Sequence, residues 1–176
     1  MQDQTALKVC LVVLLLAAGG LDLAVRKIPN RLLLAGLLCA ALLHLASATP
    51  GSQLASGALG FGVGLLVFLP LYSLRGMAAG DVKLMATVGA FTGPGQAFEI
   101  ALATFCIGGL MALGLVLARR RTRAAVANLG ALLRPLIWRM LGMPLTGEPP
   151  GPSVGSMPYG VAIALGTWLM LCLRHG

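Results

Sequence analysis

The chain has 176 residues, a hydrophobic fraction of 58%, a charged fraction of only 10% and a net charge of +8. Soluble domains carry about 25% charged residues on average, so this composition argues against a soluble globular fold. The positive charge does not indicate nucleic-acid binding, because the lysines and arginines cluster at the ends of apolar stretches and form no basic face with aromatic residues. The composition predicts an integral membrane protein.

Six apolar stretches approach or reach the length of a membrane helix, which needs about 17 to 25 apolar residues. In chain order they are residues 6–25, 32–48, 54–74, 76–93, 97–118 and 157–173. Turn-forming sequences such as KIPNR, ATPGSQ and GPGQ separate them. The sequence therefore predicts an all-α membrane protein with about six transmembrane helices, as a single domain over residues 1–176.

The basic residues predict the orientation of these helices, because short loops rich in Lys and Arg stay in the cytoplasm. Of the 13 basic residues, all but Lys8 and Arg174 lie after the first stretch, near the junction of the third and fourth, or after the fifth. The N-terminus is therefore expected outside, and the long basic loop at about 119–156 in the cytoplasm.

Several residues within the stretches are expected to serve packing. Gly60 and Gly64, like Gly89 and Gly93, are four residues apart, a spacing that lets helix backbones approach closely in lipid. Flexibility near a substrate groove is the alternative. His44 is expected to be a hydrogen-bonded packing residue. Core packing, in preference to zinc or disulfide chemistry, is also expected of four cysteines that form no CxxC pair: Cys10, Cys39, Cys106 and Cys172.

Two of the five acidic residues occupy unusual positions. Asp3 and Glu148 fall in polar segments, and Glu99 follows the GPGQ turn on the expected outer side. Asp22 and Asp81 instead sit at the edges of apolar stretches, where ionisable residues usually face the protein interior or a water-filled cavity. The predicted orientation places both at the cytoplasmic level of the membrane.

Two neighbouring carboxylates can hydrolyse a peptide bond without a metal or a nucleophilic side chain. One takes a proton from water, while the other polarises the carbonyl and protonates the leaving nitrogen. Because a helix N-terminus stabilises an anion, Asp81 is the expected base and Asp22, near a helix C-terminus, the acid. A fourth helix that began at Val82 would be only about 18 Å long, which favours a start upstream of Asp81 and weakens that assignment.

Three stretches resemble motifs of the type IV prepilin (leader) peptidase family. In DLAVRKIPNRL, Asp22 stands six residues before Ile28-Pro29-Asn30, as in the family's first aspartate motif. GMAAGDVKLM, with Gly80, Asp81 and Lys83, resembles the family's Gly-x-Gly-Asp followed by x-Lys-Leu. MPYGVAIALG is similar to the family's C-terminal Pro-Tyr/Phe-Gly stretch.

The resemblance implies a multi-pass aspartic endopeptidase of the bacterial cytoplasmic membrane. It implies that Asp22 and Asp81 are the catalytic pair, that no cofactor is needed, and that the partners are a prepilin or pseudopilin with a basic leader and the lipid bilayer, with no nucleic acid. Longer family members carry paired CxxC motifs and methylate the new N-terminus, whereas this sequence has no such motif. It is similar to the short, peptidase-only members that serve Flp or tight-adherence pili.

The residues around the aspartates have expected roles of their own. Pro29 is expected to stop the helix or to turn the chain, and Asn30 to cap the second helix. Lys83 either orients the substrate or extends to the headgroups. Ala78 replaces the first glycine of the family's Gly-x-Gly-Asp motif, a change that is less tolerable if the backbone there has a positive φ.

Other functions are compatible with membrane-embedded carboxylates. A protease that cuts inside membrane spans also uses Gly-x-Gly-Asp, although its first aspartate lies in a different motif. A small proton or ion transporter subunit would need acidic groups along a path across the membrane. A non-catalytic partner in pilus assembly is the third alternative.

Overall fold

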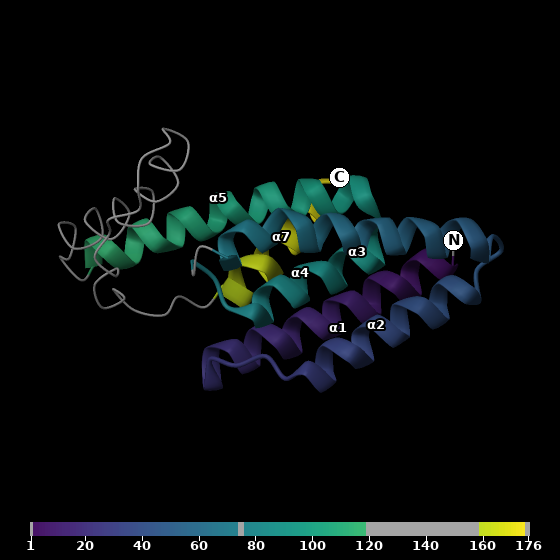
Figure 1. Ribbon diagram of the computed structural model, residues 1–176, viewed down its shortest axis with the longest axis horizontal. Helices are drawn as coiled ribbons and strands as arrows, with labels where there is room; N and C mark the ends of the chain where they lie inside the picture. The colour runs from purple at the N-terminus through teal and green to yellow at the C-terminus, as the bar shows by residue number, and fades with distance from the viewer. Residues whose placement is uncertain (1, 74–75, 119–158, 175–176) are drawn as a thin grey trace, which may run out of the picture. The chain divides into compact units, whose positions relative to one another are not determined.

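The computed structural model describes residues 2–73, 76–118 and 159–174, and these form six helices (Figure 1). The helices are α1 (Gln2–Val25), α2 (Asn30–Leu45), α3 (Pro50–Ser73), α4 (Ala79–Thr92), α5 (Pro94–Ala118) and α7 (Tyr159–Leu173). Residues 1–108 and 158–176 form one compact unit. A second unit covers residues 109–157, of which 109–118 at the end of α5 are described. The loop predicted at about 119–156 lies outside the described residues.

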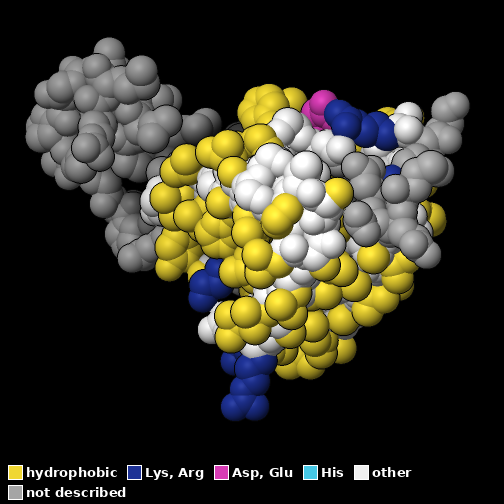
Figure 2. All heavy atoms as spheres, turned by 90° about the vertical axis from the view of Figure 1, so that its right-hand side faces the viewer, with side chains coloured by type: hydrophobic (Ala, Val, Ile, Leu, Met, Phe, Trp, Pro, Cys, Tyr) yellow, Lys and Arg dark blue, Asp and Glu magenta, His cyan; other side chains and the backbone are white. Residues whose placement is uncertain are grey.

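The lengths and surfaces of these helices suit a lipid environment. Three helical segments are long and apolar enough to cross a membrane: Thr5–Val25, Pro50–Ser73 and Pro94–Ala118. The helices α2 and α7 are apolar but shorter. Hydrophobic side chains cover most of the described surface that Figure 2 shows, and large ones such as Leu16 and Leu66 are exposed. The prediction of an all-α membrane protein is confirmed.

The shortest of the described helices, α4, lies at the centre of the first unit. It has 14 residues, most of them buried, and it contacts α1, α2, α3 and α7. A helix of this length extends about 21 Å, less than the roughly 30 Å of the hydrocarbon core. Because its neighbours surround it, α4 needs no match to the thickness of the bilayer. It begins at Ala79, upstream of Asp81, as the length argument favoured.

Glycines allow α3 to pack tightly on α4. Gly60 lies directly against Gly89, and a Cβ added at Gly60 would come within 2.8 Å of the Cα of Gly93. One turn further along α3, a Cβ at Gly64 would be 2.5 Å from the carbonyl oxygen of Met85. The packing interpretation of the glycine spacing is confirmed.

Successive helices from α1 to α4 run in alternating directions, and α7 runs parallel to α4 (Figure 1). The C-terminal end of α1 and the N-terminal ends of α4 and α7 consequently lie at one end of this unit, on the left of Figure 1. The described basic residues at this end are Arg26, Lys27, Arg31 and Lys83. Lys8 and Arg174 lie at the opposite end, where Arg174 forms an exposed salt bridge of 3.2 Å with Glu99.

The burial of His44 and of the four cysteines tests two further expectations. His44 is 5% exposed, and its Nε2 is 2.8 Å from the carbonyl oxygen of Ala90, so the side chain links α2 to α4 as predicted for a packing residue. All four cysteines are free thiols. The expectation that they fill the core is wrong for Cys106 and Cys172, which are exposed on outward-facing sides of α5 and α7.

Replacing Gly60 by alanine is expected to destabilise the protein, because the new methyl group meets the backbone of α4 instead of a movable side chain. Overpacking of this kind typically costs about 1–3 kcal/mol. Gly62→Ala is the matched control, since a Cβ there meets nothing within 4 Å. Thermal unfolding of the purified variants in detergent measures the difference, and equal melting temperatures for the two would contradict the α3–α4 contact.

Candidate active site

Asp22 approaches the N-terminus of α7 from the C-terminal part of α1. Its side chain is 7% exposed, and its Oδ2 accepts a hydrogen bond of 2.9 Å from the backbone N–H of Gly160. Since α7 begins at Tyr159, this N–H has no partner within its own helix. The Asp22 carboxylate on α1 therefore caps α7, a helix that begins more than half the chain length later in the sequence.

The chain turns away immediately after Asp22. Arg26 has a left-handed backbone, with φ 56°, and its N–H donates to the carbonyl oxygen of Asp22 at 3.1 Å. A single left-handed residue is a common way to end a helix. The end of α1 thus leaves Asp22 in its last turn, level with the start of α7.

Gly160 leaves space for the Asp22 side chain as well as donating to it. A Cβ added at Gly160 would lie 2.9 Å from Oδ2 and 3.1 Å from Cβ of Asp22. Any other residue would push the carboxyl group away from the N–H that holds it. The MPYG stretch resembles a family motif, but no pattern in the sequence links its glycine to an aspartate so far away along the chain.

Asp81 lies in the first turn of α4 and is 6% exposed. The backbone N–H of Ala78, the N-cap residue of α4, donates a hydrogen bond to its carboxylate. This is the side-chain half of a capping box, in which the third helical residue reaches back to the N-cap. Asp81 is close enough to Asp22 for the two carboxylates to interact electrostatically. The fold therefore brings together the two aspartates that the sequence singled out.

Both carboxylates are buried and lie near each other, so their negative charges repel when both are ionised. The dipole argument that made Asp81 the base and Asp22 the acid loses its basis, because both carboxylates lie at helix N-termini. The arrangement offers two neighbouring carboxyl groups, and hydrolysis by water requires such a pair with one member ionised and the other protonated.

Tyr159, the first residue of α7, lies next to Asp81. It is half-buried and close enough to Asp81 for an electrostatic interaction. On its other side, a Cβ added at Gly108 of α5 would lie 2.9 Å from the Tyr159 hydroxyl oxygen. The hydroxyl end of the Tyr159 side chain therefore lies against α5. Like Gly160, Tyr159 belongs to a stretch to which the sequence analysis gave no catalytic role.

Two contacts connect the loop between α1 and α2, together with the first residue of α2, to the start of α4. Ile28 lies beside Gly80, where an added Cβ would be 3.5 Å from the Cβ of Ile28, an ordinary contact. Lys83 Nζ donates a hydrogen bond of 3.1 Å to Asn30 Oδ1. This exposed bond joins the first and second aspartate motifs.

The prediction that Asn30 caps α2 is wrong. Pro29 is the N-cap residue, with φ −66° and ψ 133°, and no side chain caps the helix. Asn30 is already the first helical residue, so its side chain is directed to Lys83 instead. Pro29 has an extended backbone directly before α2, in the segment that connects α1 to α2.

Ala78 fits its position without strain. Its backbone has φ −79° and ψ 149°, an extended conformation that any residue adopts. The family's glycine at this position is therefore not required here for a positive φ.

No group of three or more His, Cys, Asp or Glu side chains in the described parts of the chain could hold a metal ion. The chemistry available from the described residues of the site is that of the two carboxylates and the backbone donors around them.

The chain belongs to the type IV leader peptidase family, whose model matches residues 9–113. The matched region contains Asp22, Asp81 and the residues between them, and it ends before α7. No curated protein and no solved structure matches the chain.

Changing Gly160 to alanine is expected to lower peptidase activity at least about ten-fold, because a misplacement of about 1 Å in a catalytic group can cost as much as 100-fold. The added methyl group displaces Asp22. Gly19→Ala is the control, since its Cβ would face the same helix α7 at 3.9 Å from Ala164. Initial rates of precursor cleavage by equal amounts of folded enzyme measure the effect, and full activity of the Gly160 variant would refute the contact.

Restoring the family's glycine with Ala78→Gly is expected to leave activity within about two-fold of the original, because the alanine already has an allowed backbone conformation. The same cleavage assay applies. A large gain in activity would show that the alanine restrains this turn in a way its backbone angles do not indicate.

Proposed function

We propose that this leader peptidase removes the leader from type IV or Flp-type prepilins, and that Asp22 and Asp81 activate the attacking water. The observation that supports the proposal is the meeting of these two buried carboxylates, each held by a backbone N–H at a helix N-terminus. The family supplies the reaction class, and the two aspartates supply chemistry that suits it.

The proposed reaction uses the pair as one acid and one base. The ionised carboxylate takes a proton from water as the water oxygen attacks the scissile carbonyl carbon, while the protonated carboxyl group hydrogen-bonds the carbonyl oxygen. The tetrahedral intermediate then collapses, the carbon–nitrogen bond breaks, and the leaving nitrogen receives a proton from the pair. The two residues exchange their protonation states in each cycle, so the pair is the catalytic unit.

Cleavage on the cytoplasmic side is part of the proposal. Arg26, Lys27, Arg31 and Lys83 lie at the same end as the aspartates, and basic loops of this kind face the cytoplasm. The N-terminus is then outside. A precursor that is still anchored in the inner membrane presents its leader on that side, so its scissile bond meets the pair at the membrane surface.

The proposal further specifies a peptidase without N-methyltransferase activity, acting on an Flp or tight-adherence type substrate. It is supported by the resemblance to the short family members and by the lack of a CxxC pair in the sequence. The alternatives are a proton or ion transporter subunit and a non-catalytic assembly partner. In the first the aspartates would carry protons or ions, and in the second they would have no catalytic role.

Asp22→Asn and Asp81→Asn are each expected to reduce prepilin cleavage by about 100-fold or more, the upper part of the usual range for removing a general acid or base. Each substitution keeps the shape of the side chain and removes its ability to ionise. Glu99→Gln is the matched control, because Glu99 is an exposed carboxylate at the other end of the unit. Cleavage is scored by the size shift of a co-expressed prepilin.

The amount of each variant in the membrane is measured in parallel, so that loss of folding is distinguished from loss of chemistry. Substantial cleavage by either asparagine variant would contradict the catalytic pair and favour the transporter or assembly-partner alternatives. Loss of cleavage in the Glu99 control would point instead to a general effect of removing a carboxylate.

A further inference from the structure

Two of the four free thiols in the chain lie against each other. The side chains of Cys10 on α1 and Cys39 on α2 are hydrogen-bonded to one another. Both cysteines are half-buried, whereas Cys106 and Cys172 are exposed on α5 and α7. The fold therefore creates a pair of thiols that no CxxC spacing in the sequence indicates.

The packing of α1 on α2 explains why these two cysteines meet. A Cβ added at Gly36 of α2 would lie 2.8 Å from Cδ2 of Leu14 on α1, so the two helices are in close contact at this level. They run in opposite directions (Figure 1). Cys10 comes about one turn before Leu14, and Cys39 comes about one turn after Gly36. Because residues three or four apart share a helix face, the two thiols lie at one level on the facing sides of α1 and α2.

This arrangement suits a disulfide bond. A disulfide needs two side chains that point toward each other and backbones with Cα atoms no more than about 7 Å apart. The hydrogen bond between the thiols shows that the side chains of Cys10 and Cys39 already point toward each other. One turn away, Gly36 has no side chain to hold the backbones of α1 and α2 apart.

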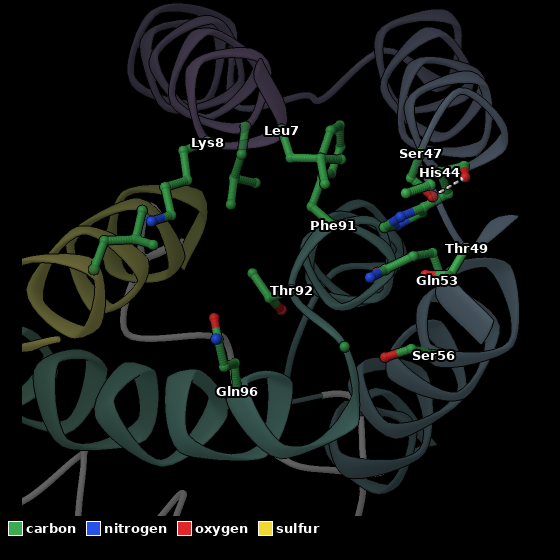
Figure 3. Close-up of a pocket in the computed structure, with 14 residues that line it drawn as sticks. Leu7, Lys8, His44, Ser47, Thr49, Gln53, Ser56, Phe91, Thr92 and Gln96 are labelled. Atoms are coloured by element: carbon green, nitrogen blue, oxygen red, sulfur yellow. Dashed lines mark hydrogen bonds between the residues drawn. The ribbon is translucent and has the colours of Figure 1, made fainter. Parts of the chain in front are cut away.

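The thiol pair is remote from the aspartates. Cys10 precedes Asp22 by 12 residues, which is about 18 Å along α1. It follows Lys8 by two residues, and Lys8 lines a cavity of about 310 Å³ at the opposite end of the unit from Asp22. Figure 3 shows Lys8 of α1 on one side of this cavity and His44 of α2 on the other. Chemistry at the thiols is therefore separate from the proposed peptidase centre.

The orientation of the helices determines which compartment is nearer to the pair. The orientation proposed above, with the basic loops in the cytoplasm, places the end that carries Lys8 outside the cytoplasm. Disulfides form and persist in oxidising compartments, whereas cytosolic thiols are kept reduced. Cys10 and Cys39 thus lie toward the side of the membrane on which a disulfide is stable.

We propose that Cys10 and Cys39 are a modification site, at which a disulfide compound oxidises the two thiols to a disulfide that joins α1 to α2. One cysteine thiolate attacks a sulfur atom of the donor, the donor's S–S bond breaks, and a mixed disulfide forms as one donor thiol leaves. The second cysteine thiolate then attacks the cysteine sulfur of the mixed disulfide and releases the second donor thiol. The protein loses two electrons and two protons, and the donor is reduced to two thiols.

The disulfide would stabilise the hairpin that carries the first aspartate motif. It closes a loop that contains Asp22 at the end of α1 and the segment that connects α1 to α2. A cross-link of this kind restricts the unfolded chain and so raises the stability of the folded state.

Thiol–disulfide exchange in the purified full-length protein tests the proposal. A variant with Cys106→Ala and Cys172→Ala retains only the pair, and it is treated in detergent with dipyridyl disulfide, an uncharged donor. The remaining thiols are blocked with N-ethylmaleimide under denaturing conditions. Trypsin cuts after Arg26, between the two cysteines, so the fragments stay together only through a disulfide. We expect mass spectrometry to find the Cys10 and Cys39 fragments joined, and dithiothreitol to separate them.

Thermal unfolding measures the effect of the link on stability. Oxidation is expected to raise the melting temperature of the variant that retains the pair by at least about 5 °C, and dithiothreitol is expected to reverse the rise. Cys10→Ser in the same background is the matched control. It keeps Cys39 but cannot close the link, so it is expected to give no joined fragments and no rise in melting temperature. If the alanine background does not fold, the unmodified protein is used, because the fragments that contain the other two cysteines have different masses.

Three outcomes would overturn the proposal. The first is the absence of joined fragments under conditions in which the donor modifies the exposed Cys106 and Cys172 of the unmodified protein. The second is a disulfide between two copies of the chain, detected as a species of twice the mass. The third is full alkylation of Cys10 and Cys39 when whole cells are treated with N-ethylmaleimide before lysis, which would show that the pair stays reduced in the membrane. None of these measurements uses cleavage of a prepilin, so their failure would leave the proposed peptidase function untouched.

Discussion

Burying two carboxylates inside an apolar helix bundle is the constraint on which the rest of this structure depends. The effective cost of removing one ion from water is several kcal/mol, and a hydrogen bond to a charged group returns about 1.5–3 kcal/mol. One bond per carboxylate is therefore insufficient if both are ionised. The fold meets part of this cost with a backbone N–H for each aspartate.

The need for backbone donors explains where the helices begin. Only the first turns of a helix offer N–H groups without partners, and both aspartates use such groups. Asp81 uses the start of its own helix, α4, whereas Asp22 uses the start of α7. The ends of α1, α4 and α7 must therefore meet at one level, and the shortness of α4 permits this inside a ring of longer neighbours.

Close packing on α4 means that the neighbouring helices also fix the position of Asp81. The glycines of α3 allow two backbones to touch, and His44 ties α2 to the same helix through Ala90. A central helix held from two sides cannot slide along its axis without breaking those contacts. The position of Asp81 is thus set by residues one or more turns away, and the same packing leaves a polar space at the opposite end.

The sequence by itself determined the membrane class, the helices and the two aspartates, because these depend on composition, on runs of apolar residues and on local motifs that need no partner. It also predicted that the spaced glycines serve helix packing and that His44 is a packing residue. It could not assign Asn30 to Lys83, or Gly160 to Asp22, since each pair joins residues far apart in the chain. Nor could it distinguish an aspartate at the end of its own helix from one that caps another. Those features were decided only by the tertiary structure, because a hydrogen-bond donor acts on whichever carboxylate the packing of helices brings within about 3 Å of it.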